Sequence, residues 1–238
     1  MTPVRPHLLP ALLAALAASA ICAQQPAQPP AGETLVFHFE RAALPVPAYT
    51  FTLHQDGTGT YAASYAAAVP ASKFAPVYPQ AQTAPPVETT RPIALSPRIT
   101  AQLFDRVRST DRFRSGCESK LKNIADTGAK TITYTTPEGS AHCTYNFTEN
   151  KTVAAITETF QGIAQTLDEG RTIDLKHRYD RLGLDRELSN LADAVHDGRA
   201  IEVATIAPVL QSLCDDSQVM ERVRKRAAGL LSASTSAR

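Results

Sequence analysis

Residues 35–40 read Leu-Val-Phe-His-Phe-Glu and residues 49–54 read Tyr-Thr-Phe-Thr-Leu-His, and the alternation in these two stretches decides the fold. In the first, the apolar side chains of Leu35, Phe37 and Phe39 are separated by single residues, and the second repeats that spacing. A period of two places every second side chain on the same face of an extended chain. Both stretches therefore predict β-strands with one buried face.

The connection after residue 54 constrains how these strands pair. Gln55-Asp56-Gly57 is a turn sequence, and Thr58 to Ser64 predicts a third strand. Phe51 and Tyr61 share a face only if the loop contains an odd number of residues. We therefore expect a three-residue loop in which Gly57 is left-handed.

A second hairpin is predicted further along the chain. Lys130 to Thr136 and Ala141 to Phe147 have strand character, and Pro137-Glu138-Gly139 separates them as a turn. Cys143, Tyr145 and Phe147 would face inward, because they occupy every second position.

Helical spacing surrounds this hairpin. Ser96-Pro97 predicts the start of a helix that ends near Thr110, since serine caps a helix and proline fits its first turn. A second apolar stripe begins after Lys151, and Gly170 is expected to end it. The chain thus predicts an α+β fold: a small antiparallel sheet of two hairpin units with packed helices, followed by a C-terminal helical segment.

The predicted domain organisation has five parts. These are a signal peptide at 1–23, a Pro-rich tether at 24–33, an α+β domain at 34–169 with an Ala/Pro-rich loop at 64–93, a helical segment at 170–231 and a disordered tail at 232–238. Within the helical segment we expect helices near 172–179, 185–196, 200–213 and 217–231, the third interrupted near Pro208 and the fourth capped by Ser217.

The first residues have the pattern of an export signal. Arg5 is followed by an apolar run of about 14 residues, short of the roughly 20 needed to span a bilayer, and small Ala23 precedes a polar stretch. Cleavage after Ala23 or Ala20 would deliver the protein to the periplasm or the medium of a bacterium. The alternative is a lipid anchor at Cys22, although Ile21 departs from the Gly or Ala of that signal.

Composition excludes several classes of protein. Hydrophobic residues make up 43% of the chain and its formal net charge is +1, so it is neither a disordered polyelectrolyte nor a general attractor of nucleic acid. There is no Gly-rich phosphate loop and no serine-hydrolase elbow, and no other segment is apolar enough to span a membrane. We expect no cofactor and no transmembrane helix.

The cysteines predict one bridge. Cleavage would leave Cys117, Cys143 and Cys214, and two of three should pair in an oxidising compartment. Cys117 and Cys143 flank one β segment, so we expect them to form the disulfide. Cys214 lies on a helical pattern and is interpreted as a buried thiol that acts as a small hydrophobe.

Asp126-Thr127-Gly128-Ala129 is the sharpest chemical motif. It resembles the catalytic Asp-Thr-Gly-Ala of retroviral-type aspartic proteases, and Leu182 to Asp185 is similar to a later signature of that family. Those enzymes are all-β, whereas the chain between these motifs contains a strong helix. We therefore interpret Asp126 as a turn residue before a strand, and a hydrolase that uses Asp126 remains an alternative.

Two other groupings have weaker chemical content. His38 and His54, with Glu40 and Asp56 nearby, could bind zinc, but the favoured interpretation is exposed sheet residues, so no metal site is predicted. The basic runs are interpreted as solvated helix ends. They comprise Arg222, Arg224, Lys225 and Arg226, and Lys176, His177, Arg178 and Arg181.

The first hairpin also carries a resemblance. Glu40-Arg41, Pro47-Ala48-Tyr49, Leu53, Asp56-Gly57 and Tyr61 stand at the spacing found in an uncharacterised family of small bacterial envelope domains, periplasmic or lipid-anchored. The resemblance covers about residues 34–168 and departs from the family at 43–46, where the family has paired cysteines. It implies an α+β fold and an envelope location, and no activity.

These observations favour an exported, non-catalytic envelope module that binds a protein or a cell-surface component. A periplasmic hydrolase or a secreted protease inhibitor are the alternatives, and the oligomeric state stays open. No nucleic-acid partner is expected.

Overall fold

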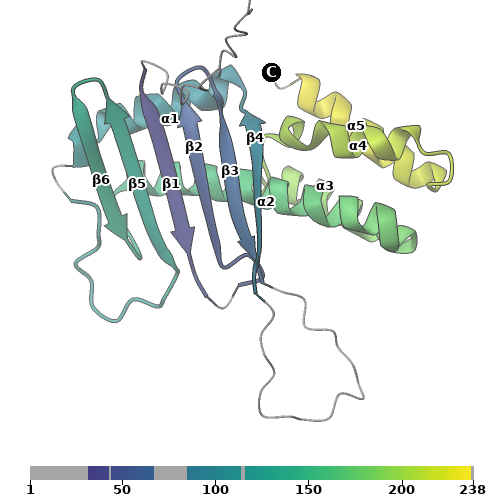
Figure 1. Ribbon diagram of the computed structural model, residues 1–238, viewed down its shortest axis with the longest axis horizontal. Helices are drawn as coiled ribbons and strands as arrows, with labels where there is room; N and C mark the ends of the chain where they lie inside the picture. The colour runs from purple at the N-terminus through teal and green to yellow at the C-terminus, as the bar shows by residue number, and fades with distance from the viewer. Residues whose placement is uncertain (1–31, 43, 67–84, 114–115, 237–238) are drawn as a thin grey trace, which may run out of the picture. The chain divides into compact units, whose positions relative to one another are not determined.

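The chain forms one six-stranded antiparallel sheet, with strand order β4-β3-β2-β1-β5-β6 (Figure 1). The strands are β1 (Thr34–Glu40), β2 (Ala48–His54), β3 (Thr58–Tyr65), β4 (Val87–Ala94), β5 (Ala129–Thr136) and β6 (Gly139–Tyr145). This computed structural model describes residues 32–42, 44–66, 85–113 and 116–236, all within the compact unit Ala31–Arg238. The predicted leader with Cys22, most of the predicted tether and residues 67–84 lie outside the described residues.

The period-two pattern gives the sheet one apolar face, as predicted. Phe37 pairs with Phe51, and Phe51 pairs with Tyr61, so these rings form a continuous buried row across three strands. Residues 55–57 form the expected three-residue loop, and Gly57 has a φ of 84°. The predicted α+β class is therefore confirmed.

The predicted bounds of the Ala/Pro-rich loop, 64–93, are wrong at both ends. β3 continues through Tyr65, and Val87–Ala94 forms β4 at the edge of the sheet. Most side chains of β4 are exposed, so it lacks the alternation that identified the other strands. Pro92 pairs with Thr60 in this strand, which an edge position tolerates because its outer side needs no N–H donor.

Two helices lie on the apolar face, behind the sheet in Figure 1. They are α1 (Pro97–Ser109), capped by Ser96 as predicted, and α2 (Lys151–Tyr179), capped by Asn150. Phe160 of α2 stacks on Phe37 with 4.9 Å between the ring centroids. β6 ends at Tyr145, so Phe147, predicted to face inward, lies in the connection to α2 and is 40% exposed.

The prediction that Gly170 ends a helix is wrong, and the predicted domain boundary there falls inside a continuous helix. α2 runs on through Gly170, and this glycine serves close packing instead. A Cβ at Gly170 would lie 2.4 Å from Cγ2 of Ile206, and one at Gly162 would lie 3.2 Å from Cγ1 of Ile201. Between them, Thr166 Oγ1 donates to the carbonyl oxygen of Ile201 at 2.6 Å. The segment from Ile201 to Ile206 therefore packs directly on α2.

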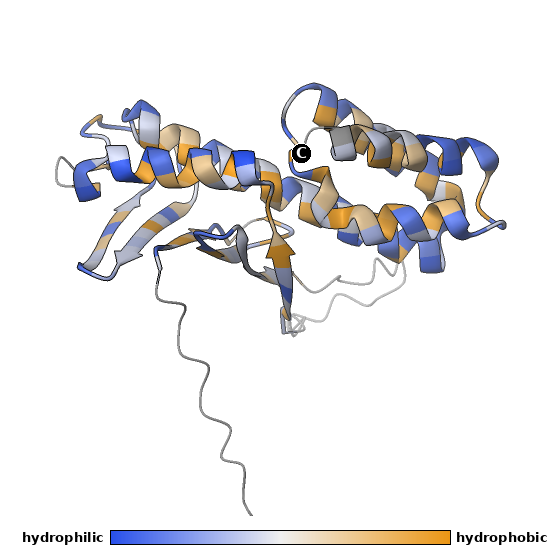
Figure 2. Ribbon diagram, turned by 90° about the horizontal axis from the view of Figure 1, so that it is seen from above, coloured by the Kyte–Doolittle hydropathy of each residue, from blue (hydrophilic) through white to orange (hydrophobic). Residues whose placement is uncertain are grey.

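The remaining helices complete a core that is continuous with that of the sheet. They are the 3-10 turns η1 (Asp111–Phe113), η2 (Arg181–Gly183) and η3 (Val203–Ile206), and the helices α3 (Leu184–His196), α4 (Ala207–Asp215) and α5 (Glu221–Ser236). In Figure 2 the hydrophobic residues of the C-terminal helices lie mainly where these helices face one another. None of the helices in the described ranges is both long and apolar enough to cross a bilayer.

Two further predictions for this region are wrong. Ser217 does not cap a helix, because α5 begins at Glu221, and the tail predicted to be disordered from residue 232 is helical through Ser236. Leu230 near the end of α5 is 8% exposed, so packing of the last turns stabilises them. Pro208 stands in the first turn of α4, where its missing N–H costs no hydrogen bond.

Candidate functional site

A cavity of about 400 Å³ lies between α2 and the end of the sheet where β1 connects to β2. This volume is within the range of ligand pockets. Its wall on the sheet side is formed by Phe39, Tyr49 and Tyr61, and residues 44–46 of the β1–β2 connection form one rim. We call it the tyrosine–carboxylate pocket, because α2 contributes Asp168 and Glu169 to the opposite side.

The aromatic wall follows from the strand pattern. Tyr49 and Tyr61 occupy inward positions of β2 and β3, so the same alternation that builds the core brings their rings together. The Phe39 and Tyr49 rings stack with centroids 4.9 Å apart, and Tyr49 and Tyr61 are 6.0 Å apart. Burial raises the pKa of both tyrosines far above the usual range. The wall is therefore buried and uncharged at neutral pH.

The helical side of the pocket is polar. Gln161, Ala164, Gln165 and Asp168 recur at spacings of three and four along α2, which places them on one face of the helix. Glu169 is next to them and is half-buried, as is Asp168. Among the described residues, no donor forms a hydrogen bond or an ion pair with either carboxylate.

Both carboxylates are perturbed by their surroundings. Burial raises the pKa of Asp168, and the more distant charges of Arg171 and Arg91 oppose that shift. Burial also raises the pKa of Glu169, and the neighbouring charges of Glu187 and Asp168 raise it further. A pair of desolvated carboxylates in a cavity is a feature of functional sites more often than of structural surfaces.

Two arginines lie beside the pocket, Arg171 against Tyr65 outside the lining and Arg91 over Tyr61 in its aromatic wall. The guanidinium carbon of Arg171 is 3.9 Å from the centroid of the Tyr65 ring, and that of Arg91 is 5.7 Å from the centroid of Tyr61. Neither lines the cavity, so the described lining contains two carboxylates and no cationic side chain. Nη2 of Arg91 is buried without a hydrogen-bond partner in the described part of the chain.

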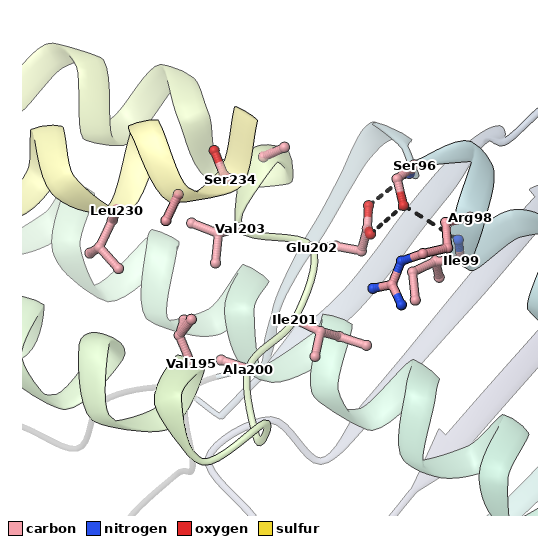
Figure 3. Close-up of a pocket in the computed structure, with 12 residues that line it drawn as sticks. Ser96, Arg98, Ile99, Val195, Ala200, Ile201, Glu202, Val203, Leu230 and Ser234 are labelled. Carbon is pink, nitrogen blue, oxygen red and sulfur yellow. Dashed lines mark hydrogen bonds between the residues drawn. The ribbon is translucent and has the colours of Figure 1, made fainter. Parts of the chain in front are cut away.

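A second cavity, of about 210 Å³, lies where the start of α1 meets the C-terminal helices (Figure 3). Its carboxylate, Glu202, is fully engaged: it accepts from the backbone N of Ser96 at 2.7 Å and from Oγ of Ser96 at 2.6 Å. Glu202 has a left-handed φ of 57°, a strained conformation that these two bonds hold in place. This carboxylate joins the C-terminal helices to α1, and its role is structural.

The Asp-Thr-Gly-Ala motif forms a turn around a buried lysine. Asp126 is exposed, and its Oδ1 accepts the N–H of Gly128 at 2.8 Å, which is the predicted turn role. Nζ of Lys130 donates to the carbonyl oxygens of Thr127, Gly128 and Asn146 at 2.8–3.1 Å. Burial lowers the pKa of Lys130, and the charge of Asp126 opposes that shift. We call Lys130 with these three carbonyl oxygens the lysine cage, and the sequence pattern did not predict it.

The later protease-like signature, Leu182 to Asp185, ends in a carboxylate that has its own partners. Asp185 forms ion pairs with Arg226 at 2.6 Å and Arg222 at 3.1 Å, which join α3 to α5. Its carboxylate is therefore neutralised by two arginines, while that of Asp126 bonds to its own turn. The two motifs do not form a shared catalytic pair.

The predicted cysteine pair is brought together. The sulfur atoms of Cys117 and Cys143 are at bonding distance, with 6.0 Å between the Cα atoms. Cys214 is a free, half-buried thiol on α4, and burial raises its pKa. Such a thiol is a poor nucleophile.

The histidines lie on the sheet face away from the helices. His38 bonds through Nδ1 to Thr50 Oγ1 at 2.9 Å, whereas His54 pairs with Thr34, four residues away along β1. Four residues of strand span about 13 Å, too far for one ion to bind both rings. Within the described residues, no group of three or more His, Cys, Asp or Glu side chains could hold a metal.

The basic runs are largely ion-paired. On α5, Lys225 pairs with Glu221 at 2.7 Å, in addition to the two arginines on Asp185. On α2, Lys176 pairs with Glu187 at 3.1 Å, and His177 contacts Asp216 at 2.9 Å. Apart from the Lys225–Glu221 pair, which lies within α5, these contacts join α2, α3 and α5 to other parts of the C-terminal region, so the runs contribute to its packing.

Sequence reasoning did not find the tyrosine–carboxylate pocket. The one available signal was the polar spacing of 161, 165 and 168 beside the apolar stripe of α2. No known family model matches the chain, and no curated protein matches it significantly.

Proposed function

We propose that this protein is an exported, non-catalytic module of the bacterial cell envelope that binds a protein or a surface component in the tyrosine–carboxylate pocket. The observation that carries the proposal is the pocket itself, a buried aromatic wall opposite two carboxylates that have no hydrogen bond or ion pair among the described residues. The export pattern at 1–23, the Cys117–Cys143 pair and the resemblance to small envelope domains support the location.

The lining favours binding over catalysis. Its described residues include no Ser, Cys, His or Lys, so the serine- or cysteine-type pair of a nucleophile and a base is absent from the described lining. Asp168 and Glu169 are adjacent on a helix, where successive side chains diverge by about 100°. They are therefore not arranged as a pair that shares one proton, although both line the cavity and can contact a ligand there.

The test fills the pocket without changing its charge. Ala164 lines the cavity and is 7% exposed, so Ala164→Leu places three extra carbon atoms inside it. The full chain, expressed with its own leader, is cross-linked in the periplasm, and captured partners are compared with those of Ala154→Leu, the same substitution on α2 outside this pocket. Loss of a partner with Ala164→Leu alone supports the proposal, and identical capture by both variants contradicts it.

The two alternatives are a hydrolase that uses Asp126 and a secreted protease inhibitor. No contact among the described residues specifically supports either of them. A peptidase assay at acid pH with Asp126→Ala separates the first from a binding module. Activity that a folded Asp126→Ala variant loses would establish the hydrolase.

A further inference from the structure

The tyrosine–carboxylate pocket differs from the rest of the molecule in the state of its charges. The carboxylate of Glu202 in the second cavity accepts two hydrogen bonds, and Asp185 has two arginines. In contrast, Asp168 and Glu169 are half-buried, and within the described chain they have neither hydrogen bonds nor ion pairs. Arg171 and Arg91 act on Asp168, and Arg199 acts on Glu169, without a hydrogen bond or ion pair. Because burying a charge without a direct partner is unfavourable, a cation bound in the pocket would supply the contact that both carboxylates lack among the described residues.

The opposite wall suits the same ligand. The rings of Phe39, Tyr49 and Tyr61 line the cavity, and an aromatic face attracts a cation within about 6 Å. Lys130 already lies 5.8 Å from the centroid of Phe39 and Arg91 lies 5.7 Å from that of Tyr61, so Tyr49 is the ring of this wall that has no cation over it among the described residues. Leu44 and Val46 at the rim, with Ala164 on α2, provide apolar contact for a hydrocarbon chain. An anion would meet two negative charges and no positive one in this lining.

We propose that the tyrosine–carboxylate pocket binds a primary ammonium group carried on an aliphatic chain, with Asp168 and Glu169 as counter-ions and the aromatic wall against the chain. This rests on the proposed function and adds its ligand class. Two sources present this chemistry, a lysine side chain of a partner protein and a free diamine. The amide oxygen of Gln161, on the same helical face, can accept a further ammonium proton, whereas the amide of Gln165 is engaged by Arg199.

The test uses 1,5-diaminopentane and Nα-acetyl-lysine methylamide as probes, with the Nε-acetylated lysine as the neutral match. Binding to the full chain is measured by calorimetry and by chemical-shift titration. We expect both ammonium probes to bind, and the acetylated probe to bind at least about tenfold more weakly, which corresponds to a lost charge-assisted contact. Tighter binding of the diamine or of the lysine probe identifies the source, and either order supports the ammonium assignment.

The matched variants remove charge at constant shape. Asp168→Asn with Glu169→Gln should weaken binding of the ammonium probes at least about tenfold, while Glu158→Gln, an exposed carboxylate on α2 outside this pocket, should leave it unchanged. Thermal melts confirm that each variant is folded. Equal binding by the double variant, equal binding of the acetylated probe, or no ammonium binding at millimolar concentration overturns the assignment. If partner capture still depends on Ala164, only the ligand class fails and the proposed function stands.

Discussion

Gly170→Ala is expected to destabilise the protein, although alanine is the better helix former. In an open helix the substitution stabilises by about 1 kcal/mol. Here the new Cβ would lie 2.4 Å from Cγ2 and 3.0 Å from Cβ of Ile206, well inside the 3.5–4.0 Å of carbon contacts. Ile206 is 1% exposed and β-branched, so it cannot swing aside. Overpacking of this kind costs about 1–3 kcal/mol, and we expect a net loss of about 1–2 kcal/mol.

The assay is denaturant unfolding followed by circular dichroism, with Gly229→Ala as the matched control. Gly229 is exposed within α5, and a Cβ there would meet nothing within 4 Å, so its substitution should stabilise by about 0.5–1 kcal/mol. Combining Gly170→Ala with Ile206→Ala should cost less than the sum of the single changes, because the clash is gone. Stabilisation by Gly170→Ala equal to that by Gly229→Ala would refute the packing of η3 on α2.

Three further outcomes follow from the structure. The raised pKa of Asp168 means that its neutral form stabilises the fold below the unfolded pKa of 3.8 and that this stability is lost as the pH rises through the folded pKa. Asp168→Asn should therefore raise the melting temperature at pH 7 and change it little at pH 3, and a lower melting temperature at pH 7 would contradict the absence of a protein partner. Lys130→Met leaves three carbonyl oxygens, one buried and two part-buried, without the donor Nζ and should cost about 1–3 kcal/mol in urea unfolding. An unchanged midpoint would show that the hydrogen bonds of Lys130 contribute nothing. Cys117→Ser opens the bridge to Cys143, which closes a loop of 26 residues, and should lower the free energy of unfolding by about 3 kcal/mol. If a reducing agent left the melting temperature of the wild-type protein unchanged, the bridge would not be formed.

The two main errors in predicting the fold, at β4 and at Gly170, have a common cause: in both places the tertiary surroundings override the local sequence signal. β4 was missed because its exposed side chains do not alternate and Pro92 argues against a strand, whereas at an edge both features are tolerated. Gly170 was assigned as a helix end because glycine most often has that role. Its actual role is set by Ile206, which is distant in the sequence and reaches it only after η3 packs on α2.

The candidate site was beyond prediction for a related reason. Asp168 and Glu169 are ordinary helix residues in the sequence, and Tyr49 and Tyr61 are ordinary strand residues. Only the packing of α2 across the sheet end places them around one cavity. Conversely, Asp126 carries a recognisable motif, yet its contacts are those of a turn.

The sequence by itself determined the pairing of Cys117 with Cys143, which are 26 residues apart and flank one β segment. It also determined features that depend on neighbouring residues: the alternating strands, the left-handed Gly57 and the cap at Ser96. These follow from short-range sterics and hydrogen bonding, which a few adjacent residues specify. The tertiary structure alone decided the edge strand, the close contact at Gly170 and the tyrosine–carboxylate pocket. Burial, desolvation and the absence of a partner for a charge depend on residues far apart in the chain, so they exist only once the helices have packed on the sheet.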